Sequence, residues 1–382
     1  MRILYVFPEP LPLPKARGIQ VANTVHALAK QGVNVTLAYA PAAGQHDPFS
    51  HYGLRCPDNV ELVPLSRGLG WPLHRLFSVH SNKLFFRRLH AWLTHQIQND
   101  NPPQAIFVRH IKTAYSILRA FPGIPLIYEA HEVFADNAPA HKREKLARME
   151  AEILHKASVV IAISHGAAAA LKLRYHLNIN IPILPSGASL PEITPDKNWD
   201  QIGQHIVYAG SFFEWKGVQD LVAAAEWMPD CTVTLIGGDA KRIEEMKASA
   251  PAQGGRINFA GHLSHAGALS ELSHACIAVL PNRKGSVSDF TSPLKLFEYM
   301  AAGCAIVLTD IPVFREVLDD TDAVWVEPGN PKALAKGIMM LLANPQAART
   351  MGESVRRKAF DFTWEARAKK LLELINDAVK TR

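Results

Sequence analysis

The segment at residues 291–303 combines residue types that could bind a phosphate-bearing ligand. Its opening Thr-Ser-Pro run is typical of a helix start, because a hydroxyl residue can cap the helix and proline suits its first position. Backbone amides at that end, together with Lys295, would form an anion site. Glu298 follows three residues later and so shares a helix face with Lys295. Amides that hold phosphate, with a carboxylate one turn deeper for ribose hydroxyls, predict a nucleotide diphosphate site.

This segment resembles the nucleotide-sugar motif of retaining GT-B glycosyltransferases, the large family often called family 4. The family motif has two glutamates eight positions apart, followed by Ala-Met-Ala-x-Gly or a similar run. Glu298 matches the second glutamate, which in the family holds the donor ribose, while the first falls on Phe290, with Asp289 beside it. The resemblance implies donor contacts from Asp289, Thr291, Ser292, Pro293, Leu294, Lys295 and Glu298.

A second segment, residues 208–217, resembles the strand and loop with which the family grips the donor diphosphate. The family has an arginine after the first glycine and a lysine before the next. Lys216 matches the lysine, whereas Ser211 stands in the arginine's place. The resemblance therefore assigns Lys216, with Lys295 and the helix end at Ser292, to neutralising the leaving diphosphate. The alternative is a solvated lysine at a helix start.

Two further segments match places where the family contacts its donor. Gly261 and Leu263 follow an expected strand, where the family makes backbone contacts to the nucleobase, although a turn glycine would also explain the pattern. In the first half, Gly18 permits close approach of backbone to a ligand. Arg17 beside it is the candidate for the charge missing at Ser211, and an exposed loop arginine is the alternative.

His131 is the third candidate catalytic residue, after Lys216 and Glu298. It lies at the carboxyl end of an expected strand, in a Glu-Ala-His run. A similar Glu-x-His segment in family members places its histidine near the donor sugar and the reaction centre. A satisfied structural histidine is the alternative. Glu129 and Glu132 could simply cap the turn at Val133.

Short apolar runs alternate with helical patterns along the chain, which predicts an α/β protein. Such continuous apolar strands favour parallel sheets covered on both faces. The expected strands lie at 2–7, 33–40, 105–108, 126–128, 159–163, 205–209, 232–236, 257–259, 277–280 and 305–308. The expected helices include 18–31, 144–156, 218–227, 266–274 and 332–342.

This pattern, with the resemblance, predicts two doubly wound, Rossmann-like domains facing across a cleft. Ligands in such folds bind outside the carboxyl ends of the strands. Residues 1–190 would form an acceptor-binding domain and residues 203–361 the nucleotide-sugar-binding domain. Residues 362–382 resemble the terminal helix that crosses back to the first domain in GT-B proteins.

Composition excludes several classes of protein. The 382 residues suit two domains, and 48% hydrophobic residues are ordinary for a globular chain. Apolar runs are too short to span a bilayer, and prolines near the start interrupt any signal-peptide core, so a cytoplasmic protein is expected. The four cysteines are widely spaced and read as free thiols rather than zinc ligands or disulfides. We expect no metal or other cofactor.

A basic segment at residues 62–99 carries no acidic residue and accounts for much of the net charge of +6. Aromatic and leucine residues interleave with its arginines. Anionic lipids attract such cations, so residues 67–93 could contact the inner face of the membrane. A packed core helix with a solvated basic rim is equally consistent with the pattern. Nucleic-acid binding is not expected, since no recognised module occurs.

The sequence therefore predicts a retaining glycosyltransferase that moves a sugar from a nucleotide diphosphate-sugar to a hydroxyl of a glycan, lipid-linked or small-molecule acceptor. Two alternatives stay open: a GT-B nucleotide-sugar epimerase, and a non-catalytic nucleotide-sugar-binding protein. The sugar, the base and the acceptor are not specified by the sequence.

Overall fold

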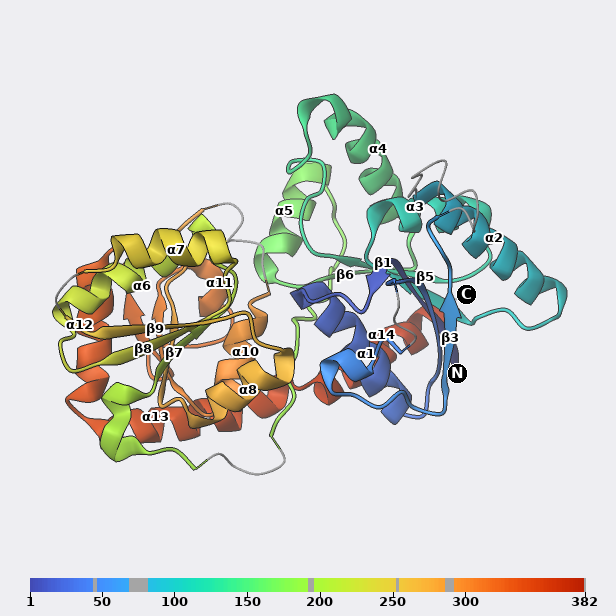
Figure 1. Ribbon diagram of the computed structural model, residues 1–382. Coiled ribbons are helices and arrows are strands. Elements are labelled where there is room, and N and C mark those ends of the chain that lie inside the picture. The colour runs from blue at the N-terminus through green and yellow to red at the C-terminus, as the bar shows by residue number, and fades with distance from the viewer. Residues whose placement is uncertain (44–46, 69–81, 192–195, 252–253, 286–291, 381–382) are drawn as a thin grey trace. The chain divides into compact units, whose positions relative to one another are not determined.

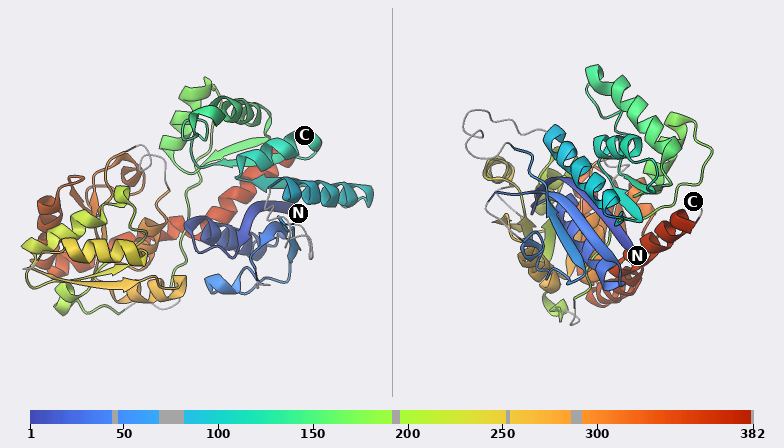
Figure 2. Two further views of the ribbon diagram at one scale, coloured as in Figure 1. Left: turned by 45° about the horizontal axis from the view of Figure 1, so that its top comes forward. Right: turned by 90° about the vertical axis from the view of Figure 1, so that its right-hand side faces the viewer.

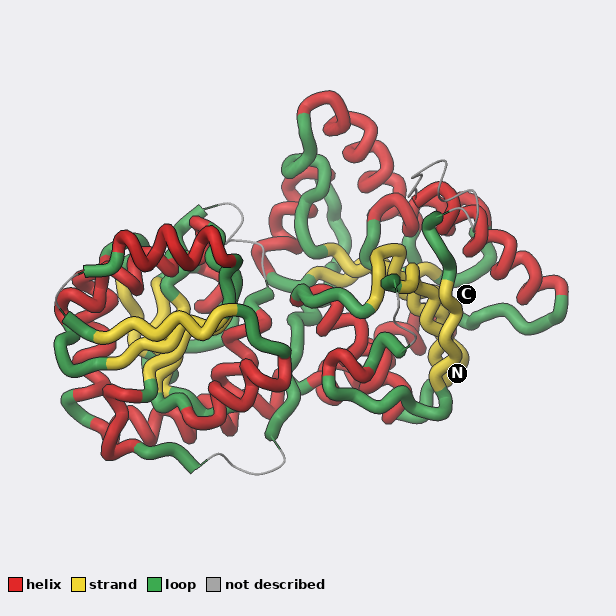
Figure 3. Tube along the Cα trace, in the orientation of Figure 1, coloured by secondary structure: helices red, strands yellow, loops and turns green. Residues whose placement is uncertain are grey.

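The computed structural model describes residues 1–382 except 44–46, 69–81, 192–195, 252–253, 286–291 and 381–382 (Figure 1). The chain divides into two compact units, one of Met1–Pro185 with Trp364–Arg382 and one of Ser186–Thr363. Each unit has its own sheet of parallel strands between helices (Figure 3). The expected pair of doubly wound, Rossmann-like domains is thereby confirmed. The chain passes between the units at Pro185–Ser186, slightly before the expected linker, and the terminal helix belongs to the first unit.

The first unit is built on a six-stranded sheet in the order β3-β2-β1-β4-β5-β6. All neighbouring strands in it are parallel. Its strands are β1 (Arg2–Leu11), β2 (Asn34–Pro41), β3 (Val60–Pro64), β4 (Ala105–Val108), β5 (Leu126–Ala130) and β6 (Val159–Ala162). Its helices are α1 (Ala16–Lys30), α2 (Asn82–Gln98), α3 (Ile111–Ala120), α4 (Ala140–Lys156), α5 (His165–Tyr175) and α14 (Trp364–Lys380), with a short turn η1 (Ser50–Tyr52).

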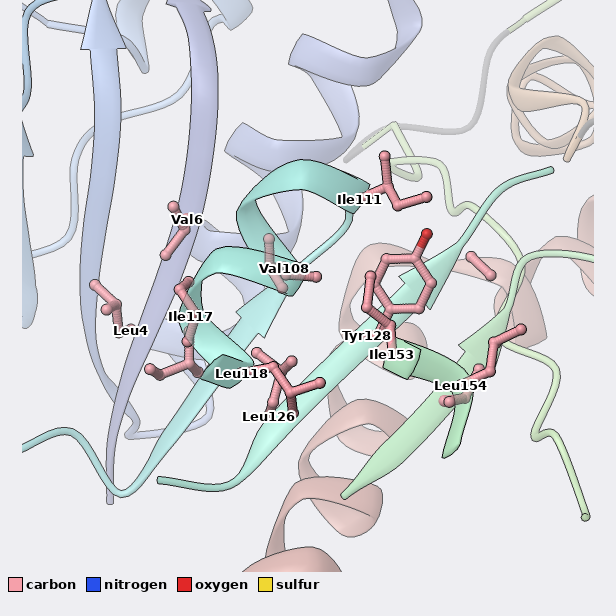
Figure 4. Packing of buried hydrophobic residues seen from close by; sticks show 14 of the residues in the cluster. Leu4, Val6, Val108, Ile111, Ile117, Leu118, Leu126, Tyr128, Ile153 and Leu154 are labelled. Carbon is pink, nitrogen blue, oxygen red and sulfur yellow. The ribbon is translucent and has the colours of Figure 1, made fainter. Parts of the chain in front are cut away.

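Helices cover both faces of this sheet because its strands are apolar on both sides. On one face, strand residues such as Val6, Val108 and Tyr128 pack against Ile117 of α3 and Ile153 of α4 (Figure 4). On the other face α14 packs beside α1, as the views in Figures 1 and 2 agree. The sheet is therefore buried, and its loops and edges are left to carry function.

Helix α2 forms most of the described part of the basic segment, and its apolar side belongs to the core. Phe85, Leu89 and Leu93 are fully buried, and Phe86 and Trp92 pack against the same core. The apolar side of residues 82–98 therefore packs as part of a core helix, and contact of residues 67–93 with a membrane stays a prediction. The rest of the aromatic stretch, residues 69–81, lies outside the described residues. Within the described part of the chain, no helix is both long and apolar enough to span a bilayer.

The second unit is built on a parallel sheet in the order β12-β11-β10-β7-β8-β9. Its strands are β7 (Ile206–Ala209), β8 (Thr232–Ile236), β9 (Arg256–Gly261), β10 (Ile277–Leu280), β11 (Ala305–Thr309) and β12 (Val324–Val326). Its helices are α6 (Val218–Ala224), α7 (Ala240–Ser249), α8 (His265–His274), α10 (Leu294–Ala301), α11 (Pro312–Arg315), α12 (Pro331–Leu342) and α13 (Pro345–Lys358). Short 3-10 turns are η3 (Trp199–Gln204), η4 (Glu214–Lys216), η5 (Ala225–Trp227) and η6 (Ala359–Phe362).

Each face of the second sheet packs against its own hydrophobic core. Helices α8, α10 and α11 contribute to the core on one face, α6, α7 and α12 contribute to the core on the other, and α13 contributes to both. At the carboxyl ends of the strands, the loops approach one another so closely that glycine is required. A Cβ atom on Gly217 would lie 1.8 Å from the carbonyl oxygen of Pro281, and one on Gly237 would lie 1.9 Å from that of Gly210. Both glycines also have positive φ angles, 67° and 117°.

Candidate active site

The carboxyl edge of the second sheet gathers the residues that the sequence singled out in that half of the chain. The loop after β7 runs through η4 to Gly217, which precedes α6. Helix α10 brings Lys295 and Glu298 to the same place, because Lys295 is close enough for its charge to act on Lys216. The two segments most similar to the family's donor-binding motifs therefore meet in space.

Glu298 is the centre of this cluster. Its side chain is 3% exposed, and its two oxygens have different partners. Lys295 Nζ lies 2.7 Å from Oε2, as the three-residue spacing predicted, and His265 Nε2 lies 3.0 Å from Oε1. Burial alone would raise the pKa of the Glu298 carboxyl, but Lys295 and His265 outweigh it and lower that pKa to about 2. The carboxylate is therefore ionised at neutral pH and held in one orientation.

Lys216 is a half-buried cation without a carboxylate partner among the described residues. Its Nζ lies 4.1 Å from the ring centroid of Trp215, a cation–π contact that holds the ammonium in place. Burial, and then the charge of Lys295, lower the pKa of Lys216 to about 8. Glu298 pairs with Lys295, and the positive charge of Lys216 beside Lys295 is left over, so this cluster carries an excess of positive charge. Such a cluster favours an anion.

Helix α10 begins differently from the expectation. It starts at Leu294, with Pro293 in the capping position rather than the first helical position, and no side chain caps it. The Ser292 hydroxyl instead accepts a hydrogen bond of 2.8 Å from the Ser186 amide. This hydrogen bond connects Ser186, the first residue of the second unit, to the start of α10. The sequence predicted that Thr291 or Ser292 could cap the helix and gave no sign of this long-range contact. Thr291 and Asp289 lie outside the described residues.

The remaining expected donor contacts lie at the same edge of the sheet. Ser211 is exposed, and its carbonyl accepts a 2.8 Å hydrogen bond from the Tyr208 hydroxyl. Gly261 ends β9 with a φ of 69°, and its carbonyl accepts a 2.7 Å hydrogen bond from the Gly237 amide. Leu263 packs partly buried against the core. The loop therefore has a fixed shape, as a backbone-contact segment would require.

His131 directly follows β5 in the first unit, and both of its ring nitrogens point into the protein. Its Nδ1 lies 3.2 Å from a guanidinium nitrogen of Arg109, and its Nε2 lies 3.4 Å from Oε2 of Glu129. Burial, and then the charge of Arg109, lower the pKa of His131 to about 4, so the ring is neutral at pH 7. Because a guanidinium only donates, Nδ1 accepts and the ring proton lies on Nε2.

Glu129 does not cap a turn but forms the centre of a buried polar cluster. It is fully buried and accepts hydrogen bonds from Arg367 on α14 and from Gln20 on α1, the latter at 3.1 Å. Burial would raise the pKa of Glu129, but Arg367, His131 and Arg109 lower it well below its usual range. The turn is capped instead by Glu150 of α4, which accepts from the amides of residues 134 and 135 at 3.0 and 3.2 Å.

Arg17 and Gly18 lie in the first turn of α1, not in the loop before it, because α1 begins at Ala16. Arg17 forms a 2.6 Å ion pair with Glu9, so its charge is already balanced. A Cβ atom on Gly18 would lie 2.3 Å from both the Leu13 carbonyl and the Tyr52 hydroxyl. The backbone at Gly18 therefore lies against atoms of the first unit itself, and these contacts alone account for the glycine.

Sequence reasoning missed His265, Arg109, Gln20 and Arg367. The only sequence signal for Arg367 is a charged residue on the apolar side of an amphipathic terminal helix, and Gln20 likewise lies on the buried side of α1. Among the described residues, no group of three or more His, Cys, Asp or Glu side chains could hold a metal ion.

Comparisons with known proteins agree with this arrangement. Residues 18–179 match the family model described as glycosyl transferase 4-like domain, and residues 203–344 match the model described as glycosyl transferases group 1. Phosphatidyl-myo-inositol mannosyltransferase of Mycobacterium tuberculosis is 29% identical over 153 residues, which are 37% of this chain and 39% of that protein. D-inositol 3-phosphate glycosyltransferase of Xylanimonas cellulosilytica is 24% identical over 287 residues, 68% of each chain.

Solved structures share the whole fold. Sucrose-phosphate synthase from Thermosynechococcus elongatus has a TM-score of 0.77 at 20% identity, covering 100% of both chains. HepE from Anabaena, solved in complex with UDP and glucose, has a TM-score of 0.70 at 15% identity and covers 99% of this chain and 100% of its own. This chain covers less than two thirds of the length of the mannosyltransferases it matches. The two family models together span most of the chain, which therefore belongs to the glycosyl transferases group 1 family, with GT4-like domains and the GT-B fold.

Proposed function

We propose that this protein transfers a sugar, with retention of configuration, from a nucleotide diphosphate-sugar to a hydroxyl of an acceptor. The observation that carries the proposal is the cluster of Lys216, Lys295 and Glu298 at the carboxyl edge of the second sheet. Glu298 pairs with Lys295, while neighbouring Lys216 has no carboxylate partner among the described residues. A diphosphate would complete this cluster electrostatically.

Each side chain of the cluster has a distinct role in the proposed reaction. The anomeric carbon–oxygen bond of the donor breaks, and its electron pair stays on the diphosphate, whose growing charge Lys216 and Lys295 stabilise. Glu298, fixed by His265, accepts hydrogen bonds from the ribose. The acceptor oxygen bonds to the anomeric carbon on the face that the diphosphate leaves, and its proton passes to the departing phosphate oxygen. Because the lysines supply the positive charge, this route needs no metal ion.

The comparisons support a nucleotide-sugar donor and an acceptor hydroxyl. The HepE structures contain UDP or UDP-glucose, and a similar donor is proposed for this chain. The names of two relatives specify acceptors that carry inositol and phosphate, one of them lipid-linked. We extend this to a proposed acceptor of the same kind, a polyol or glycan hydroxyl on a lipid-linked or soluble molecule.

Nucleoside diphosphate affinity is expected to fall as the pH rises above 8. The pKa of Lys216 is about 8 in the ligand-free protein, and only its protonated form attracts the anion. The terminal phosphate has lost its second proton by about pH 7, since its pKa is near 6, so the ligand's charge stays constant above that. Calorimetric titration between pH 7 and 10 should show the dissociation constant rising by up to about tenfold per pH unit.

The matched variant for this titration is Lys216→Arg, whose guanidinium stays charged over the whole range. Its dissociation constant should be nearly independent of pH between 7 and 10. If wild type and Lys216→Arg showed the same pH profile, Lys216 would not be the group that titrates.

The proposed function is tested by nucleotide release. The protein is incubated with UDP-glucose, UDP-galactose and GDP-mannose, each with and without myo-inositol, an inositol phosphate and a simple glycan. We expect acceptor-dependent release of nucleoside diphosphate with one donor, and an NMR coupling constant showing the donor's anomeric configuration in the product. Inversion would refute the retaining mechanism. Nucleotide binding without release would indicate a non-catalytic binder, and sugar interconversion without an acceptor would indicate an epimerase.

A further inference from the structure

The first sheet has a topological switch point that the cluster around Lys216 does not use. From β1 the chain moves one way to β2 and β3, and then returns to the other side of β1 for β4, β5 and β6. Ligands of open parallel sheets bind outside the carboxyl ends of the strands at such a point. Arg109 is the residue that directly follows β4, next to β1 at this switch.

The hydrogen-bond partners of Arg109 are neutral groups, while the charges of Glu129 and Glu9 act on it from a longer distance. One terminal nitrogen donates to Oε1 of Gln20 at 2.6 Å, and the other contacts Nδ1 of His131 at 3.2 Å. These bonds use two of its five N–H groups. Among the described residues, no carboxylate lies within ion-pair distance of Arg109. Arg17, by contrast, forms an ion pair of 2.6 Å with Glu9.

The cluster around Arg109 has more positive than negative charge. Its one buried carboxylate, Glu129, is bound by Arg367 and lies beside neutral His131. Two guanidiniums therefore share one carboxylate. Withdrawing a charge from water without a partner is costly, and the remaining excess would be relieved by an anion from outside the cluster.

Three atoms of the cluster also lack the hydrogen bonds that buried polar atoms normally make, Arg367 Nε being one of them. His131 Nε2 and Glu129 Oε2 are buried and lie 3.4 Å apart, without the alignment of a hydrogen bond. A purely structural network would be expected to satisfy both. The incomplete hydrogen bonding shows that the groups around Arg109 do not form a fully satisfied structural network.

We propose that Arg109 forms an anion-binding subsite of the first unit that takes a phosphate group. A guanidinium fork matches phosphate oxygens in charge and geometry. The identity of the phosphate rests on the proposed function, since it belongs either to the donor diphosphate or to the acceptor. Arg109, and not Arg17, is then the arginine that acts on the ligand in this half of the chain.

The subsite is tested with Arg109→Met, Arg109→Lys and Arg17→Met in the full-length protein, with Arg119→Met as the surface control. Arg119 is an exposed arginine of the same unit, paired with Glu152. The affinity for UDP, GDP, ADP and CDP is measured first by calorimetry. The affinity for inorganic phosphate is then measured by thermal shift, without nucleotide and with the best nucleotide at saturation.

Arg109→Met should weaken phosphate-group binding by about 10- to 100-fold, the effect of losing one charged hydrogen-bonding partner. A loss of nucleoside diphosphate affinity assigns the subsite to the donor. Unchanged nucleotide affinity, with lost phosphate binding at nucleotide saturation, assigns it to the acceptor. Arg109→Lys should retain part of the affinity for phosphate. It replaces Arg109→Met in these titrations if the methionine variant does not fold.

The proposal is overturned if Arg109→Met and Arg119→Met behave alike in both titrations, or if the loss appears in Arg17→Met instead. The test separates this inference from the proposed function. A wild-type protein that binds no nucleotide, but binds phosphate through Arg109, would refute the donor assignment and leave the subsite standing.

Discussion

Lys216→Ala is expected to lower turnover by about 10²- to 10³-fold, which corresponds to a loss of about 3–4 kcal/mol of transition-state stabilisation. The half-buried ammonium has no carboxylate partner among the described residues, so it is available to the charge that develops on the leaving diphosphate. The donor carries part of that charge before reaction, so KM should rise less than kcat falls. Nucleotide release at saturating donor measures both constants.

Two variants control for charge and position. Lys216→Arg keeps the positive charge and should retain more activity than Lys216→Ala, although the guanidinium cannot reproduce the contact over Trp215 in the same geometry. Lys336→Ala removes an exposed lysine from α12 of the same unit and should leave turnover unchanged. Near-wild-type turnover in Lys216→Ala would contradict the assigned role.

Arg367→Met is expected to destabilise the protein by about 3–5 kcal/mol, the range for removing one partner of a buried ion pair. It leaves the fully buried Glu129 carboxylate without its closest cation. It also removes the hydrogen bonds of 3.1 and 3.2 Å that Arg367 donates to the carbonyls of Leu184 and Pro185, where the chain leaves the first unit. The midpoint of thermal unfolding should fall by about 10 °C.

The double variant Glu129→Gln/Arg367→Met separates charge from packing. Removing the orphaned carboxylate should recover a substantial part of the lost stability, so the two effects should be strongly non-additive. Lys369→Met, an exposed lysine on the same helix, should change the midpoint little. Equal destabilisation by Arg367→Met and Lys369→Met would show that the buried pair does not stabilise the fold.

Local patterns, together with the family resemblance, were sufficient to predict the fold and the proximity of Lys295 to Glu298. Continuous apolar strands alternating with helices specify buried parallel sheets, and both sheets form with the ten expected strands. The edge strands β3 and β12 were not expected. Lys295 and Glu298 meet because a spacing of three residues along a helix places two side chains on one face. Lys216 joins them because both segments follow strands of one parallel sheet and so emerge at the same edge.

The rest of the site depends on contacts between residues far apart in sequence. Glu129 and Arg367 are 238 positions apart, and nothing local to either residue indicates the other. The same holds for His265 and Glu298, which come from different helices. The ion pair between Arg17 and Glu9 could not be predicted from the sequence either, because it forms only when β1 places Glu9 beside the start of α1. Long-range charge pairing therefore decided which arginine stays available for a ligand.

Nucleoside diphosphate binding to wild type and Glu298→Ala tests the central claim most directly. A thermal-shift screen with UDP, GDP, ADP and CDP should show one base clearly preferred, because a ligand at 100 times its dissociation constant adds about 2.7 kcal/mol of stability. Glu298→Ala should lose most of that shift, while Glu271→Ala, an exposed residue on α8, should keep it. No shift with any nucleotide, or an equal shift in Glu298→Ala, would contradict the assignment of this cluster as the donor site.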